Sequence, residues 1–242
     1  MKQLPSVNSL IVAAGLTFFG AATAFADRAK TAHEPPFTVW DIVLGGEISQ
    51  IPERDLAVVA CGTNGGPPSR PLDSLSDFKV CPAEGDGSHE VYLSYDDELE
   101  YRALALELPT EAALHAGTTV AGHPVVVSVL VSNDGVIGGI RVVTDSRAEI
   151  RDRRRAASLA ATLKSRFQGD WNCVDQPPDE GEVALSGVFI KQTCERSDPQ
   201  QDLLLLNTRY LRKKGQRSQD RATGKRTKGA FESLTRFEQR KR

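Results

Sequence analysis

Residues 125–170 carry the pattern that most constrains the fold, namely two β-branched runs, a tight turn and a helix. The runs 125–131 and 136–143 are rich in valine and isoleucine, which favour strands. The step Asp134-Gly135 between them supplies the positive φ angles that a short hairpin turn needs. The segment therefore predicts an antiparallel β-hairpin.

A helix is predicted directly after this hairpin, over residues 146–168. Ser146-Arg-Ala-Glu149 has the form of a capping box, and Gly169 supplies a stop. Apolar residues then recur at helical spacing, at Ala156, Leu159, Ala160, Leu163 and Phe167. Arginines fall mainly on the other side, at Arg147, Arg151, Arg154 and Arg155. A solvated helix face is the usual role of such a stripe, and an anion clamp is the alternative.

Further strands are predicted on both sides of this unit, at residues 37–44, 56–60, 90–95, 188–194, 203–210 and 231–237. Residues 101–108 fit the periods of both strand and helix, and we assign them to a strand. Strands before and after a single long helix, with connections of hairpin length, predict an α+β fold with a mainly antiparallel sheet.

The first 26 residues have the form of a cleavable signal peptide. Lys2 precedes the apolar run 10–19, and Ala24-Phe25-Ala26 matches a small-residue cleavage site, so the mature chain is expected to begin at Asp27. No later segment approaches the roughly 20 apolar residues of a membrane-spanning helix. We therefore expect a periplasmic protein, with secretion from a eukaryotic cell as the alternative.

Four cysteines lie in the mature part, and an even number after an export signal favours disulfides. Of the three possible pairings we prefer Cys61 with Cys81 and Cys173 with Cys194, because each pair brackets about twenty residues rich in proline and glycine. Each pair is followed by a strand-like run. Residues 27–210 are predicted to form one acidic domain, and the shared order has two explanations: residues 37–108 and 125–210 are related halves, or, since the spacings differ by several residues, the order arose by chance.

Charge is divided unevenly along the chain. Residues 209–242 contain 13 Lys and Arg against three acids, a net charge of +10, whereas residues 27–208 have a net charge of −13. We interpret residues 211–242 as a basic C-terminal tail. The tail either folds onto the acidic body or binds an anionic partner, and the candidate contacts are Arg209, Arg212, Lys213, Lys214, Arg217 and Arg221.

No motif of high specificity points to catalysis, and no cofactor or metal is expected. The glycine-rich loop at residues 61–66 could offer amides to a phosphate, but it lacks the order of known phosphate loops. The acids at 96–98 lack the spacing of a calcium loop. His115 and His123 flank a glycine-containing segment and are the candidate residues of a hydrolytic site.

These observations lead to two functional hypotheses. The first is an exported, non-catalytic binding or accessory protein of the cell envelope, whose basic tail meets an envelope protein, an anionic polymer or a lipid surface. The alternative is a periplasmic hydrolase that uses His115 or His123. Export argues against nucleic acid as a partner, although basic runs with aromatic residues are common in nucleic-acid binders.

Overall fold

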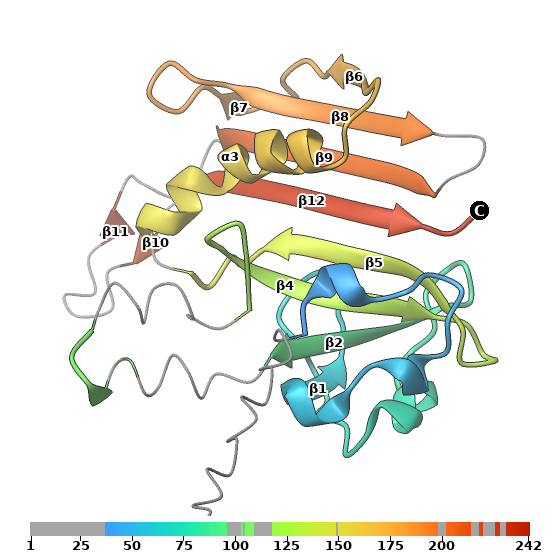
Figure 1. Ribbon diagram of the computed structural model, residues 1–242. Coiled ribbons are helices and arrows are strands. Elements are labelled where there is room, and N and C mark those ends of the chain that lie inside the picture. Colours follow the sequence, from blue (N-terminus) through green and yellow to red (C-terminus); the bar gives the residue numbers. More distant parts are fainter. Residues whose placement is uncertain are drawn as a thin grey trace, which may run out of the picture. The chain divides into compact units, whose positions relative to one another are not determined.

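The computed structural model places one large antiparallel sheet at the centre of the fold (Figure 1). It describes residues 37–95, 103, 105–108, 118–148, 150–197, 202–213, 218–219, 226–227 and 231–242. The strands are β1 (Leu56–Cys61), β2 (His89–Tyr95), β3 (Thr119–Val120), β4 (His123–Val131), β5 (Ile137–Thr144), β6 (Asn172–Asp175), β7 (Glu182–Val183), β8 (Ile190–Ser197), β9 (Leu203–Lys213), β10 (Ser218–Gln219), β11 (Arg226–Thr227) and β12 (Glu232–Arg240). The helix α3 spans Ile150–Arg166, and short 3₁₀ segments lie at Val39–Asp41, Ile48–Gln50, Glu53–Asp55 and Leu75–Val80.

The strand order places the last strand of the chain inside the sheet. The order is β1-β2-β4-β5-β12-β9-β8-β6, with β3 paired to β4 and β7 paired to β9. In this arrangement Phe237 of β12 is opposite Val142 of β5 on one side and Leu206 of β9 on the other. The strand β12 therefore joins a first group of strands, β1 to β5, to a second group, β9 with β8 and β6.

The basic tail predicted at residues 211–242 is not confirmed. The strand β9 continues to Lys213, and β12 is an interior strand of the sheet. Between them, β10 and β11 pair with each other and not with the large sheet. The basic run after Arg209 is therefore the connection between two neighbouring strands. The sequence suggested a tail because the pairing of β12 with β5 and β9 leaves no local signal.

The core lies on the face of the sheet that carries α3. Alternate residues of β4 point into it, including Val127 and Val129, as the two-residue period of a strand requires. Leu159 and Leu163 of α3 are fully buried against this face. Burial of each such side chain stabilises the fold by about 1.5–3 kcal/mol. The Thr235 hydroxyl donates to the Ala156 carbonyl at 2.8 Å and ties α3 directly to β12.

An aromatic cluster closes the core where the segment before β1 meets the end of α3. The rings of Trp40 and Phe167 are 5.5 Å apart, and Phe167 stacks on Phe237 at 5.0 Å. The guanidinium of Arg166 lies over the Trp40 ring at 4.3 Å. Three distant parts of the sequence therefore meet here, the segment before β1, the end of α3 and the middle of β12.

Most strand predictions are confirmed. The predicted strands at 56–60, 90–95, 188–194, 203–210 and 231–237 correspond to β1, β2, β8, β9 and β12, and the hairpin at 125–143 is formed by β4 and β5. In its turn only Gly135 has positive φ, at +84°, and its amide donates to the Ser132 carbonyl at 2.9 Å. The Asp134-Gly135 step thus uses one positive φ angle and a bulge.

The predicted strand at 37–44 is wrong. The Asp41 carboxylate accepts hydrogen bonds from the Thr38 amide and hydroxyl, at 2.8 and 2.7 Å, and this local contact bends Val39–Asp41 into a 3₁₀ turn. Residues 101–108 are described only in part, and Ala103 and Ala105 are helical there. The assignment of 101–108 to a strand is therefore not supported.

The predicted helix is confirmed, although its described part is shorter than 146–168. It begins at Ile150, and Glu149, one partner in the predicted capping box, lies outside the described residues. Asp145 organises the turn before it, because its carboxylate accepts from the Arg147 amide at 2.8 Å and its carbonyl from the Ala148 amide at 3.2 Å.

Candidate functional site

Both predicted disulfides are present. Cys61 at the end of β1 is bonded to Cys81, which follows the 3₁₀ segment Leu75–Val80. Cys173 of β6 is bonded to Cys194, its direct partner across the strand pair with β8. The two bridges sit in different settings, so the related halves at 37–108 and 125–210 stay a prediction.

The structure describes three of the six predicted anion-binding residues. They lie at the end of β9 and are Arg209, Arg212 and Lys213. The other three, Lys214, Arg217 and Arg221, lie outside the described residues. The Glu232 carboxylate of β12 pairs with Arg209 at 3.1 Å and with Lys213 at 2.9 Å. Burial would raise the pKa of Glu232, but hydrogen bonds from Lys213 and Arg209 outweigh burial and lower it. One carboxylate thus faces two cations.

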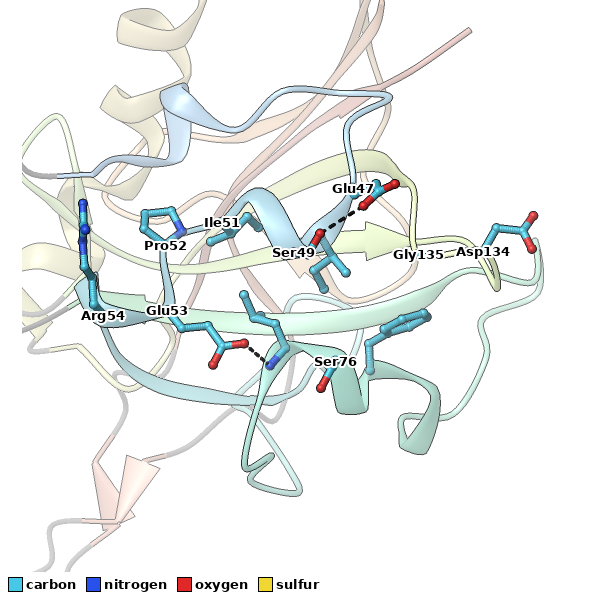
Figure 2. Close-up of a pocket in the computed structure, with 12 residues that line it drawn as sticks. Glu47, Ser49, Ile51, Pro52, Glu53, Arg54, Ser76, Asp134 and Gly135 are labelled. Carbon is cyan, nitrogen blue, oxygen red and sulfur yellow. Dashed lines mark hydrogen bonds between the residues drawn. The ribbon is translucent and has the colours of Figure 1, made fainter.

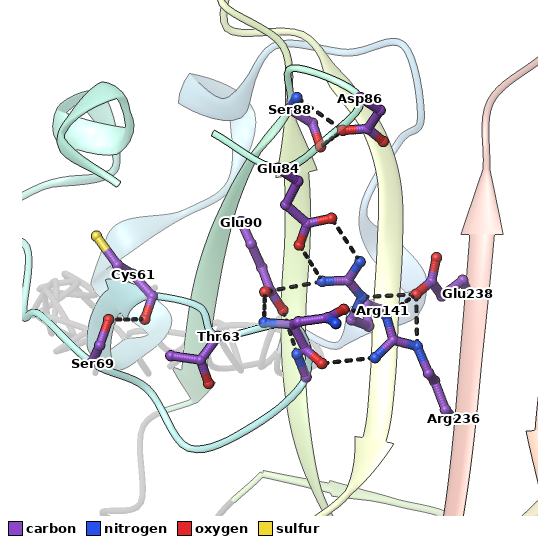
Figure 3. A network of polar contacts seen from close by, with 12 residues as sticks. Cys61, Thr63, Ser69, Glu84, Asp86, Ser88, Glu90, Arg141, Arg236 and Glu238 are labelled. Carbon is purple, nitrogen blue, oxygen red and sulfur yellow. Dashed lines mark hydrogen bonds and ion pairs between the residues drawn. The ribbon is translucent and has the colours of Figure 1, made fainter. Parts of the chain in front are cut away.

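The glycine-rich loop after β1 holds a carboxylate of the protein itself (Figure 3). The amides of Asn64 and Gly65 donate to the Glu90 carboxylate of β2, the latter at 2.9 Å. Asn64 and Gly65 have φ of +57° and +79°, a conformation that turns successive amides toward one point. A Cβ on Gly62 would lie 2.3 Å from Cγ of Glu90, so this position requires glycine. Glu90 therefore occupies the anion cradle that the sequence suggested for phosphate.

Arg141 of β5 is the centre of the charged network around this loop (Figure 3). Its side chain is 1% exposed and contacts three carboxylates. Two nitrogens of its guanidinium donate to Glu84 at 2.6 and 3.0 Å, Nη1 lies 2.9 Å from Glu90, and Nε donates to Glu238 of β12 at 2.8 Å. Arg236 also contacts Glu238 and donates to the Asn64 carbonyl at 2.7 Å.

The pKa values of two carboxylates in this network, Glu84 and Glu238, are lowered. The hydrogen bond from Arg141 lowers the pKa of Glu84. Burial would raise the pKa of Glu238, but the charges of Arg141 and Arg236 outweigh it and lower the pKa. Each buried charge has an opposite partner, so the network clamps β2, β5, β12 and the glycine loop together.

The structure describes one of the two histidine candidates. His115 lies outside the described residues, and His123 is a buried residue at the start of β4. The Nε2 atom of His123 is 3.2 Å from the Ser158 hydroxyl of α3. Burial and the charge of Arg155 lower the pKa of His123. A neutral imidazole next to a hydroxyl is the arrangement that a serine nucleophile needs.

Other contacts of Ser158 do not complete such a site. Its hydroxyl also donates to the Arg155 carbonyl at 2.7 Å. Ser158 lies inside α3, where backbone amides are used in the helix, so they are not available to stabilise an oxyanion. The contact between Ser158 and His123 is therefore a side-chain hydrogen bond that links α3 to β4.

A groove of about 620 Å³ lies between the segment before β1 and the turn of the β4–β5 hairpin (Figure 2). Its floor is apolar and includes Ile51 and Phe78, and its rim carries Glu47, Glu53 and Asp134. Glu53 accepts hydrogen bonds from the Ser74 hydroxyl and the Leu75 amide, both at 2.8 Å. This carboxylate therefore supports the wall of the groove.

A second groove, of about 510 Å³, lies between α3 and β8. Ala157, Ala160 and Ala161 form its helix side, and Phe189 and Ile190 contribute apolar surface opposite. Lys164 donates to Gln192 at 2.8 Å at this site. Sequence reasoning missed both grooves, because each depends on segments that meet only in the fold.

Among the described residues, no group of three or more histidine, cysteine or acidic side chains is arranged to hold a metal ion. In the same part of the chain, no helix has the length and apolarity needed to cross a membrane. Comparison with known proteins gives no match of the chain to a family model, a curated protein or a solved structure.

Proposed function

We propose that this chain is an exported binding or accessory protein of the cell envelope that performs no chemistry of its own. Its contact with an anionic envelope component is made by basic residues that begin at the end of β9. The observation that carries the proposal is the position of these residues. They occupy a connection between two paired strands of the sheet, so both ends of the basic segment are held at one end of this strand pair.

Two disulfides support an oxidising compartment. Disulfides persist in the periplasm and outside cells and are rare in the cytosol. Both bridges are formed and the described residues contain no free cysteine. A periplasmic location, after cleavage of a signal peptide near Ala26, is the form of this proposal that the sequence favours.

The positive charge of the connection between β9 and β12 supports the proposal of an anionic partner. The connection at 214–230 contains six lysines and arginines and one acid. Glu232 balances one unit of charge of the adjoining Arg209 and Lys213, so the region retains a positive excess. Such an excess attracts anions over a Debye length of about 8 Å at physiological ionic strength.

The test compares two effects of one variant, R212Q/K213Q/K214Q/R217Q. Binding to vesicles of anionic phospholipid and to purified cell-wall polymer is measured by sedimentation at two salt concentrations, and the melting temperature is recorded. We expect at least tenfold weaker binding to one of these partners at low salt, with little change in melting temperature, because surface ion pairs contribute only about 0–1 kcal/mol.

The control is R70Q/K79Q/R242Q, which removes three cations away from the β9 end. We expect it to bind like the unmodified protein. If the four substitutions at β9 leave binding unchanged and lower the melting temperature at low salt, the basic segment neutralises the acidic body and the proposal is wrong.

A further inference from the structure

The outward side of α3 carries a compact set of exposed arginines near its first turns. Ile150, Arg151, Arg154 and Arg155 are all exposed. At 3.6 residues per turn they occupy adjoining positions, since residues four apart are neighbours on a helix. The buried residues Ala156, Leu159, Ala160 and Leu163 lie on the opposite side. The set therefore faces solvent.

These three arginines differ from the other arginines near α3. Arg147 pairs with Asp145 at 2.7 Å, Arg153 donates to the Phe231 carbonyl at 3.1 Å, and Arg166 lies over Trp40. In contrast, within the part of the chain that the structure describes, the guanidiniums of Arg151, Arg154 and Arg155 form no ion pair or hydrogen bond. Their charge is available to a partner.

Acidic side chains do not interrupt this outward side over the described helix. Its later positions are the exposed small residues Ala161, Thr162 and Ser165, next to Ser158, whose hydroxyl contacts His123. Asp152 is half-buried and lines a small pocket with His123, so it belongs to another side of the helix. Solvated helix faces commonly mix both signs of charge, whereas this one is cationic and then neutral.

The same end of the sheet carries Arg212. The Arg153 guanidinium lies 5.2 Å from the centre of the Phe231 ring, and that ring is 5.9 Å from Tyr210 of β9. Arg212 follows Tyr210 by two residues and is therefore on the same face of the sheet. The arginines of α3 and Arg212 thus lie toward one end of the sheet.

We infer that Arg151, Arg154 and Arg155, together with Ile150, form a docking surface for an anionic phospholipid membrane. The inference rests on the proposed function, because it names the anionic component. Guanidiniums pair with phosphate oxygens in a two-bond geometry that an ammonium cannot form. Ile150 is 55% exposed beside them, and an apolar side chain at this level enters the boundary between headgroups and acyl chains.

The exposed side chain of Ile150 distinguishes binding to a membrane from binding to a soluble polyanion. Arginine–phosphate attraction weakens as salt screens it, whereas burial of Ile150 in lipid does not. Lipid binding should therefore keep a salt-resistant part that depends on Ile150. Binding of a dissolved polymer should vanish with salt and be independent of Ile150.

The experiment uses the full mature chain and vesicles of phosphatidylcholine with and without phosphatidylglycerol. R151Q/R154Q/R155Q should lower affinity for the anionic vesicles by roughly ten- to a hundredfold, since each basic residue near an anionic membrane contributes about a factor of five. R70Q/K79Q/R242Q is the charge-matched control and should bind normally. Ile150→Ser should lower the binding that remains at 0.5 M salt, with an unchanged melting temperature.

The outcomes distinguish this inference from the proposed function. If R151Q/R154Q/R155Q binds anionic vesicles like the unmodified protein while R212Q/K213Q/K214Q/R217Q does not, the α3 surface is wrong and the proposed function stands. Unchanged vesicle binding in both variants overturns this inference, and the proposed function is then decided by the measurement with cell-wall polymer. Two results together would also overturn the assignment to lipid. Soluble polyphosphate would abolish vesicle binding of the unmodified protein, and Ile150→Ser would leave vesicle binding at 0.5 M salt unchanged.

Discussion

At the scale of residues, Arg141 is the side chain on which the charged part of the sheet depends. It is nearly inaccessible to solvent and contacts carboxylates from the loop before β2, from β2 itself and from β12. Removing one member of a buried charge group typically costs about 3–5 kcal/mol, because the partners remain buried without compensation. The packing of β12 against β5 is therefore coupled to this one guanidinium.

We predict that Arg141→Gln lowers the free energy of unfolding by about 3–5 kcal/mol at pH 7 and by less at pH 3.5. The pKa values of Glu84 and Glu238 are lowered in the fold, and that of Asp86 is lowered to about 2, mainly by hydrogen bonds from Ser88. Such groups stabilise the fold above their ordinary pKa, and this contribution is lost as the pH falls.

Urea unfolding at both pH values measures the effect. In the unmodified protein stability should fall from pH 5 toward pH 2, and in Arg141→Gln this slope should be smaller, because the pKa values of Glu84 and Glu238 are no longer lowered by Arg141. Arg70→Gln, an exposed control, should change stability by less than about 0.5 kcal/mol. An identical acid slope in Arg141→Gln would show that the network does not set these pKa values.

Sequence reasoning reached only half of this network. The glycine loop at 61–66 could be recognised as a source of amides, but its acceptor could not, because Glu90 comes beside the loop only when β1 pairs with β2. The same holds for Arg141 and Glu238, which are opposite each other only in the β5–β12 register.

At the scale of elements, local sequence patterns were sufficient to predict those helices and strands that depend mainly on local contacts. The β4–β5 hairpin and α3 follow from alternation, from the Asp134-Gly135 turn and from helical spacing. The segment 37–44 shows the limit, because its alternation resembles a strand while the Thr38–Asp41 hydrogen bonds favour a 3₁₀ turn. Cysteine spacing was informative because each bridge closes a local loop, with sequence separations of 20 and 21.

The Cys173–Cys194 bridge holds an edge strand whose residues are all exposed. We predict that C173S/C194S lowers the free energy of unfolding by about 2–5 kcal/mol, because the unfolded chain gains freedom when the bridge is removed. Hydrogen exchange should accelerate at the amides of β6 more than at those of β12. C61S/C81S is the matched comparison and should spare β6. Unaltered exchange at β6 in C173S/C194S would mean that the bridge is not needed to hold this strand.

At the scale of the whole molecule, the sheet is complete only when the C-terminus is in place. The strand β12 supplies partners to both β5 and β9, so without it each of these strands has an open edge. Its alternating pattern was visible in the sequence, but its place was not, because pairing between distant strands leaves no local signal. This is why a basic tail was expected where the structure has a connection.

The connection between β9 and β12 is anchored at its two ends by paired strands of the sheet.

The most direct test of this account is cooperative urea unfolding of the chain from Asp27 to Ala230, which lacks β12 but keeps the basic connection. We predict that this chain shows no cooperative transition. A control that keeps β12 and replaces residues 214–230 by a neutral glycine–serine connection of equal length should unfold cooperatively. A cooperative transition at the native midpoint in the chain ending at Ala230 would contradict the account, because the residues after β9 would then be a dispensable tail.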